Sequence, residues 1–128
     1  MRKLLILTAV LESVTGVLLL AAPALLDWIL LGSRFDAPAS VVVARIAGGA
    51  LLALGVACWF ASSDIGSRAA YGVIVAMLVY NVAVAALLVY ADVAKGAAGV
   101  ALWPVVVAHA TLAIWCVACL SRPRVRTE

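Results

Sequence analysis

Four long apolar runs constrain the fold of this chain more than any other feature of its sequence. They cover residues 4–26, 40–61, 69–91 and 98–120, and each is 22 or 23 residues long. An α-helix rises about 1.5 Å per residue, so about 20 residues cross the roughly 30 Å hydrocarbon core of a bilayer. The sequence therefore predicts an all-α fold in which residues 1–128 form a single integral membrane domain with four transmembrane helices.

Composition agrees with a membrane location. Hydrophobic residues make up 68% of the chain and charged residues 12%, against roughly 45–50% and about 25% in an average soluble domain. A soluble domain of this size could not bury so much apolar surface, because small domains leave much of their area exposed. The lipid bilayer is thus the first predicted partner. Short connectors between long helices predict an up-down-up-down four-helix bundle.

The basic residues predict the orientation of the bundle. One side of the membrane would carry Arg2, Lys3, Arg68, Arg122, Arg124 and Arg126. The other side would carry only Arg34 and Lys95. Because cytoplasmic loops are enriched in Lys and Arg, we expect a multi-pass protein of the inner (plasma) membrane with both termini cytoplasmic, N-in/C-in. The basic residues flank apolar runs and form no stripe interleaved with aromatics, which argues against nucleic acid as a partner.

Residues at the ends of the runs support these boundaries. The aromatic residues expected at the two membrane interfaces are Trp28, Tyr90 and Trp103 on one side and Trp59 and Tyr71 on the other. A serine or aspartate in residues 62–68 is expected to cap the third helix. Pro23 is expected to bend or end the first helix. The N-terminus also resembles a signal peptide, but Glu12 and the length of the run favour a retained helix.

Each apolar run contains one strongly polar side chain: Glu12, Arg45, Asn81 and His109. An ionisable group at membrane depth costs at least about 2.5 kcal/mol, so such groups normally face the bundle interior. Counting residues along each helix places Glu12, Asn81 and His109 near the midplane. Arg45 falls about two turns nearer the outer face, from where its side chain would reach Glu12 or extend outward. These four residues are the candidates for ligand binding or proton handling.

Several functions fit such a cluster. We predict a non-enzymatic membrane protein, either an accessory subunit or a binder of a small lipophilic ligand. No catalytic or metal-binding residue is predicted. One alternative is a dimeric proton-coupled transporter of small molecules acting through Glu12 and His109. Another is a quinone-associated redox subunit in which His109 and Arg45 bind the quinone. A purely structural polar core is the fourth interpretation. Other transmembrane subunits or a second copy of the chain are the expected protein partners.

Cofactor chemistry has limited support in the sequence. Quinone and haem are the cofactors considered, although one histidine per chain provides bis-histidine haem ligation only if two chains share the haem. Cys58, Cys116 and Cys119 all lie within apolar runs, so they predict no disulfide framework. The Cys116–Cys119 spacing matches C-x-x-C, but it lies at the C-terminal end of a helix, where the dipole disfavours a thiolate. We interpret these cysteines as small apolar side chains.

Two resemblances to known families follow from these residues. The segment 43–55, Val-Ala-Arg-Ile-Ala-Gly-Gly-Ala-Leu-Leu-Ala-Leu-Gly, resembles an arginine–glycine pattern of small DoxX-like four-helix membrane proteins. That resemblance implies the four-helix topology, and some members of the family are linked to quinone or thiol metabolism. Glu12 is similar in position to the embedded glutamate of the small multidrug resistance transporters, which also have four short helices. The aromatic substrate-site positions of that family have no counterpart here.

Overall fold

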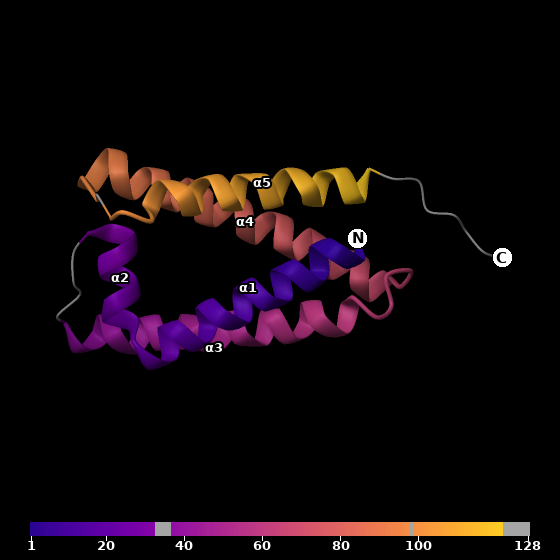
Figure 1. Cartoon of the computed structure of the whole chain (residues 1–128), viewed down its shortest axis with the longest axis horizontal. Helices are drawn as coiled ribbons and strands as arrows, with labels where there is room; N and C mark the ends of the chain where they lie inside the picture. Colours follow the sequence, from indigo (N-terminus) through magenta and orange to yellow (C-terminus); the bar gives the residue numbers. More distant parts are fainter. Residues whose placement is uncertain (33–36, 98, 122–128) are drawn as a thin grey trace.

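The chain folds entirely into α-helices in the computed structural model, which describes residues 1–32, 37–97 and 99–121. The described part holds five helices: α1 (Arg2–Ala21), α2 (Pro23–Leu31), α3 (Pro38–Ala61), α4 (Arg68–Lys95) and α5 (Leu102–Leu120). All except α2 are long and apolar enough to cross a membrane. The all-α fold with four spanning helices is thus confirmed, and consecutive spanning helices run in opposite directions (Figure 1).

The apolar run of residues 4–26 is divided between two helices, which agrees with the expected effect of Pro23. The first helix ends at Ala21, because Ala22 leaves the helical conformation (φ −140°) and Pro23 starts a second helix as its first residue. Proline lacks a backbone N–H and suits the first position of a helix, where no intrahelical partner is needed. The connector predicted after residue 26 therefore contains most of α2. α2 ends at Leu31 and is followed by Gly32, whose φ of 72° is left-handed.

The other helix ends lie within a few residues of their predicted positions. The side chain of Ser67 caps α4 by accepting a hydrogen bond of 3.0 Å from the backbone N–H of Ala70, which confirms the expected serine cap. α4 continues past residue 91 to Lys95 and stops at Gly96, which has a φ of 67°. Arg34, Arg122, Arg124 and Arg126 lie outside the described residues.

The long helices pack as two pairs. α1 lies against α3 along its length, α4 lies against α5, and contact between the pairs is much sparser. Small residues bring α1 and α3 together, since a Cβ added to Gly16 would stand 2.7 Å from the carbonyl oxygen of Gly48. Gly55 similarly lies against Ser13. Close approach over small residues is a common way for helices to pack in lipid.

The apolar interior is divided into two clusters. The larger lies toward the N-terminal end of α1 and comprises Leu4, Leu5, Ala9, Cys58, Ile74, Met77, Leu112, Cys116 and Cys119. The smaller comprises Leu88, Leu102 and Val106, with Leu30 and Leu31 of α2 packed against it. When the partly buried residues packed against each cluster are included, the two clusters are separated on α4 by residues 81–83 and on α5 by residues 107–111. The apolar core is therefore interrupted at mid-height.

α2 connects the two helix pairs at one end of the molecule. It runs across the direction of the long helices, from the α1–α3 pair toward α5 (Figure 1). The backbone N–H of Ala101 donates a 3.0 Å hydrogen bond to the carbonyl oxygen of Ile29. Gly99 lies against the backbone of Leu30 so closely that a side chain there would collide with it. α2 is thus attached to the segment that leads into α5.

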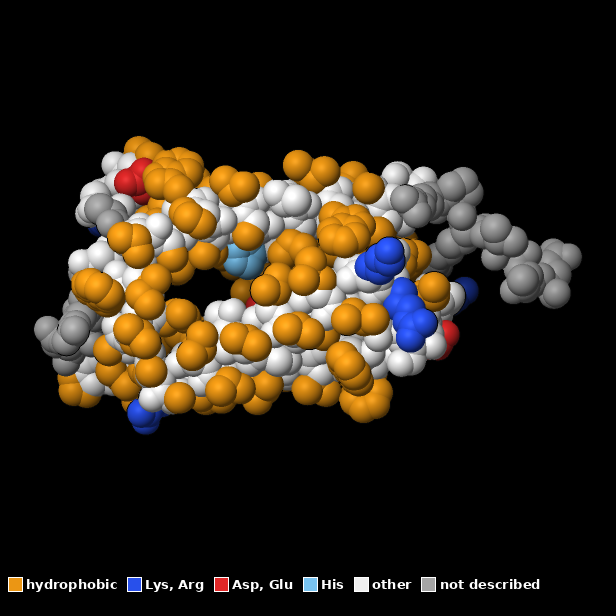
Figure 2. Space-filling model, viewed as in Figure 1, with side chains coloured by type: hydrophobic (Ala, Val, Ile, Leu, Met, Phe, Trp, Pro, Cys, Tyr) orange, Lys and Arg blue, Asp and Glu red, His pale blue; other side chains and the backbone are white. Residues whose placement is uncertain are grey.

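The outer surface is largely apolar (Figure 2). Exposed side chains include Val43, Ile46, Val79, Leu87 and Ile114, each more than 60% exposed. The five predicted interface aromatics are also exposed: Trp28, Trp59, Tyr71, Tyr90 and Trp103. A surface of this kind is stable only in contact with lipid, so the bilayer surrounds the four spanning helices.

Candidate functional site

A hydrogen bond between α4 and α5 forms the centre of the site. Nδ1 of His109 lies 2.7 Å from Oδ1 of Asn81. The amide nitrogen of Asn81 donates a second 2.7 Å bond to the carbonyl oxygen of Met77, one turn earlier on α4. Asn81 is completely buried, and both of these bonds hold its side chain in one orientation. The amide therefore fixes the rotation of the His109 ring.

Glu12 enters the same region from α1. Its side chain is only 3% exposed, and it is hydrogen-bonded to the side chain of Tyr80 on α4. The tyrosine hydroxyl donates this bond, and the carboxylate accepts it. A buried carboxyl group without such a donor would be costly in a membrane. The bond thus joins the α1–α3 pair to the α4–α5 pair at mid-height.

Tyr80 and His109 also contact each other through their rings. The ring centroids are 5.6 Å apart and the ring planes are inclined at 76°, an edge-to-face arrangement. Such a contact contributes about 0.5–1.5 kcal/mol in aromatic pairs. Glu12, Tyr80, Asn81 and His109 therefore form one continuous group across three helices, which we call the polar cluster. It occupies the level at which the apolar core is interrupted.

Tyr80 was not among the residues singled out from the sequence. It follows Leu78 and Val79 in the middle of an apolar run, far from the helix ends where tyrosine is expected in membrane proteins. A tyrosine at that depth needs a partner for its hydroxyl group. Its position beside Asn81 was the available signal.

Arg45 lies apart from the polar cluster. Its side chain is exposed on α3, where its neighbour Gly49 also faces open space. Among the described residues, no ion pair joins Arg45 to Glu12. Of the two placements left open for Arg45, the structure has the outward one, whereas Gly48 and Gly55 of the same helix are buried. An exposed arginine can extend along the lipid-facing surface until its guanidinium reaches the polar headgroups.

An opening between the helix pairs reaches the polar cluster. Figure 2 shows it as a hole bordered mainly by hydrophobic side chains, with the pale-blue histidine at its edge. The chain has one histidine, His109, and its side chain is half-buried. Figure 1, viewed from the same side, shows α1 diverging from α5 and α2 lying across the far end of the molecule. The opening combines an apolar wall with a polar edge.

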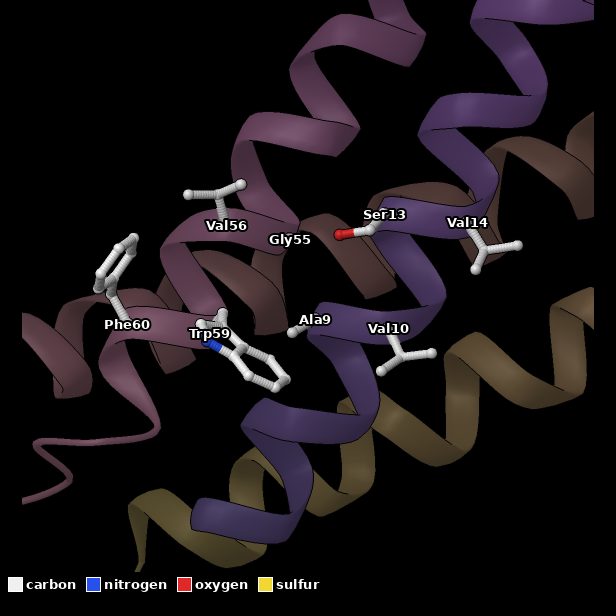
Figure 3. A pocket seen from close by; sticks show the side chains of 8 residues that line it. All are labelled: Ala9, Val10, Ser13, Val14, Gly55, Val56, Trp59 and Phe60. Carbon is white, nitrogen blue, oxygen red and sulfur yellow. The ribbon is translucent and has the colours of Figure 1, made fainter.

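A second hollow lies elsewhere, on the outer side of the α1–α3 pair. It has a volume of about 400 Å³ and is lined by Ala9, Val10, Ser13, Val14, Gly55, Val56, Trp59 and Phe60. Ser13 is directed toward Gly55, and the aromatic rings stand at one end (Figure 3). No member of the polar cluster lines this groove. Its apolar surface matches acyl chains and offers no arrangement of groups for chemistry.

The three cysteines are buried. Cys58, Cys116 and Cys119 are free thiols, and all belong to the larger apolar cluster. Their packing agrees with the interpretation of these residues as small apolar side chains.

Comparisons with known protein families, with curated proteins and with solved structures found no match for this chain. The two family resemblances seen in the sequence therefore gain no support from them. What the chain itself shows is a small multi-pass membrane protein whose helical bundle contains a buried polar group at mid-height.

Proposed function

We propose that this protein is a non-enzymatic membrane protein that binds a small lipophilic molecule between its two helix pairs. The observation that carries the proposal is the position of His109, a member of the polar cluster, at the edge of the opening (Figure 2). Binding sites for small molecules are concave, mostly apolar and contain a few fixed polar groups. The opening, Tyr80, His109 and the buried carboxyl group of Glu12 meet each of these conditions.

The fixed geometry of the cluster favours binding over a purely structural role. A structural network would need only mutual hydrogen bonds between the helices. Here the His109 ring is held by Asn81 on one side and remains half-buried at the opening. Groups already held in position lose little conformational freedom when a ligand binds, which increases affinity.

The surroundings define the class of ligand. Along α4 and α5, Asn81 and His109 lie between the two apolar clusters, and the border of the opening is mainly hydrophobic (Figure 2), so the body of the ligand is hydrocarbon. One polar group on that body would meet the polar cluster. A lipophilic molecule reaches such a site through the bilayer and needs no aqueous path. Little of the described chain lies outside the spanning helices. The role of the protein would therefore be to hold or present this molecule, alone or beside other transmembrane proteins.

The same proposal includes an orientation. We place both termini in the cytoplasm of a cell whose inner membrane contains the protein. The end of the molecule that carries Arg2, Lys3 and Arg68 would then face the cytoplasm. The opening and α2 would lie toward the opposite side (Figure 1).

The test is to identify lipophilic molecules that remain bound to the purified protein. The wild-type protein, Tyr80→Phe and His109→Leu are purified in mild detergent, extracted with organic solvent and compared by mass spectrometry. Thr111→Val is the matched control, because Thr111 is exposed on α5 and its hydroxyl bonds only to Val107 of its own helix. We expect a stoichiometric compound with the wild type and the control, and much less of it with the two cluster variants.

Folding is checked by the helical circular dichroism and the elution volume of each variant. Equal retention of the compound in all four proteins would place it outside the polar cluster and overturn the proposal. Absence of any enriched compound from the wild type, extracted from its native membrane, would also overturn it.

A further inference from the structure

The tautomer of His109 is determined by its partner. Asn81 donates from its amide nitrogen to the carbonyl oxygen of Met77, so the atom facing His109 is the amide oxygen. An amide oxygen only accepts hydrogen bonds, so Nδ1 of His109 must carry the proton. In a neutral imidazole the other nitrogen, Nε2, then presents a lone pair. The neutral form suits the site, since the partner of His109 is an uncharged amide and unpaired charge at membrane depth is costly.

Nε2 has no protein partner among the described residues, where the only hydrogen bond of His109 is that of Nδ1. Every fully enclosed side-chain nitrogen or oxygen of the described residues does have a partner. Nε2 must therefore be accessible from outside the packed interior. Its direction follows from the ring: Nδ1 points at Asn81 on α4, and Nε2 points away from it. The histidine lies at the edge of the opening (Figure 2).

We propose that the bound molecule is recognised as a hydrogen-bond donor, with a hydroxyl group donating to Nε2 of His109. This inference rests on the proposed function and adds that the polar group of the ligand is a hydrogen-bond donor. A carbonyl or ether oxygen cannot pair with Nε2 in this tautomer, because both would be acceptors. The carboxylate of Glu12 is also an acceptor, and the hydroxyl of Tyr80 is already used to donate to it. The cluster thus favours phenols and alcohols over ketones, quinones and ethers of the same shape.

The first experiment observes the tautomer directly. Because the chain has one histidine, a protein labelled with ¹⁵N-histidine and freed of any purification tag gives a single imidazole pattern. Long-range ¹H–¹⁵N correlation spectra should show a protonated Nδ1 and an unprotonated Nε2. In Asn81→Leu, which removes the acceptor, this preference should weaken. A wild-type spectrum with a protonated Nε2 would overturn the inference.

The second experiment compares 4-octylphenol with its methyl ether, 4-octylanisole. The two probes have nearly the same apolar body, and only the phenol donates a hydrogen bond. Competition with a bound fluorescent alkylphenol measures both affinities in wild type and in His109→Leu. A buried acceptor left unpaired is unfavourable, so we expect the phenol to bind wild type about tenfold more tightly than the ether. Comparison with His109→Leu cancels the different partitioning of the probes into detergent.

A third protein keeps the result interpretable if His109→Leu misfolds. In His109→Gln the amide can present either a donor or an acceptor, so binding should persist while discrimination between the probes falls severalfold. Equal affinity of wild type for both probes would overturn the donor inference and leave the binding site intact. Failure of wild type to bind either probe, with no compound retained from the membrane, would instead reject the proposed function.

Discussion

Asn81 is the residue on which the geometry of the polar cluster depends. It is fully buried and connects the backbone of α4 to the ring of His109 on α5. In lipid, an interhelical hydrogen bond of this kind contributes about 0.6–2 kcal/mol. A change at this position therefore affects both the association of α4 with α5 and the orientation of the imidazole.

A double-mutant cycle measures that contribution. We expect Asn81→Leu to destabilise the protein by about 1–3 kcal/mol, because the N–H of His109 loses its acceptor. His109→Leu in the same chain should recover part of the loss, with a coupling energy of about 0.6–2 kcal/mol. Unfolding by SDS in mixed micelles gives the four free energies. Strictly additive effects would show that the two side chains contribute independently.

Tyr80 offers a second prediction at the scale of single residues. Tyr80→Phe keeps the ring contact with His109 but removes the donor to Glu12. We expect a loss of about 1–3 kcal/mol in the free energy of unfolding, as the carboxyl group loses its partner. Adding Glu12→Leu should restore most of it, because the buried polar group is then gone. A neutral Tyr80→Phe substitution would contradict the importance of this bond.

The sequence identified three of the four members of the polar cluster for a clear reason. A glutamate, an asparagine and a histidine are rare within membrane spans, so Glu12, Asn81 and His109 were recognisable. Tyr80 was missed because tyrosine is largely apolar and occurs often near membranes. Whether Arg45 faces inward or outward was left open, because counting residues gives depth but not rotation. The faces of α3 toward lipid and toward protein are similarly apolar, so its rotation could not be read from the sequence.

At the scale of helices, the packing of α1 on α3 depends on two glycines. A Cβ on Gly16 would stand 2.7 Å from the oxygen of Gly48 and 2.8 Å from the nitrogen of Leu52. Both are backbone atoms, so the helices would have to separate. We expect Gly16→Ala to destabilise the protein by about 1–3 kcal/mol.

Gly49→Ala is the matched control for Gly16→Ala. It adds the same methyl group to a helix, but at a position with no atom within 4 Å. We expect it to be neutral or to stabilise by up to about 1 kcal/mol through helix propensity. Both variants are compared by SDS unfolding in mixed micelles. Equal effects at the two positions would contradict the close approach of α1 and α3.

α2 provides a prediction about pH. Burial raises the pKa of the Asp27 carboxyl group above its ordinary value. Because the folded state then binds the proton more tightly than the unfolded state, α2 is held most firmly at low pH. Its stability falls as the pH rises from the ordinary pKa of aspartate to the raised one. Asp27 is partly exposed, so the effect is small.

Hydrogen exchange checks this pH dependence. Protection factors of the α2 amides, corrected for the intrinsic effect of pH, should decrease across the acidic range in wild type. In Asp27→Asn they should stay constant. The same decrease in both proteins would assign the effect to another group.

The four spanning helices were predictable because their length must match the thickness of a bilayer. α2 was not, since the run of residues 4–26 has the right length for a single span and Pro23 lies near its end. The sequence indicated that the first helix would bend or stop there. It did not indicate that the chain would continue as a helix in a new direction, because that depends on the contact of Ile29 and Leu30 with the segment before α5.

At the scale of the whole molecule, orientation in the membrane is open to a direct test. Ser63 lies in the connector between α3 and α4, and Ala94 lies near the other end of α4. Both residues are exposed, so each can be replaced by cysteine and labelled. The native cysteines are buried and should give little background. In intact cells, a membrane-impermeant maleimide should label Ala94→Cys but not Ser63→Cys. The reverse pattern would place both termini outside the cytoplasm.

The division of the bundle into two pairs has a consequence for biosynthesis. The α1–α3 pair is complete once residue 61 has entered the membrane, whereas α4 and α5 are made only from residue 68 onward. Since chains generally fold from the N-terminus during synthesis, the first pair can assemble before the second exists. The space between them then closes last, when α5 arrives beside α2. The polar cluster, which needs side chains from α1, α4 and α5, is therefore the last part of the bundle to form.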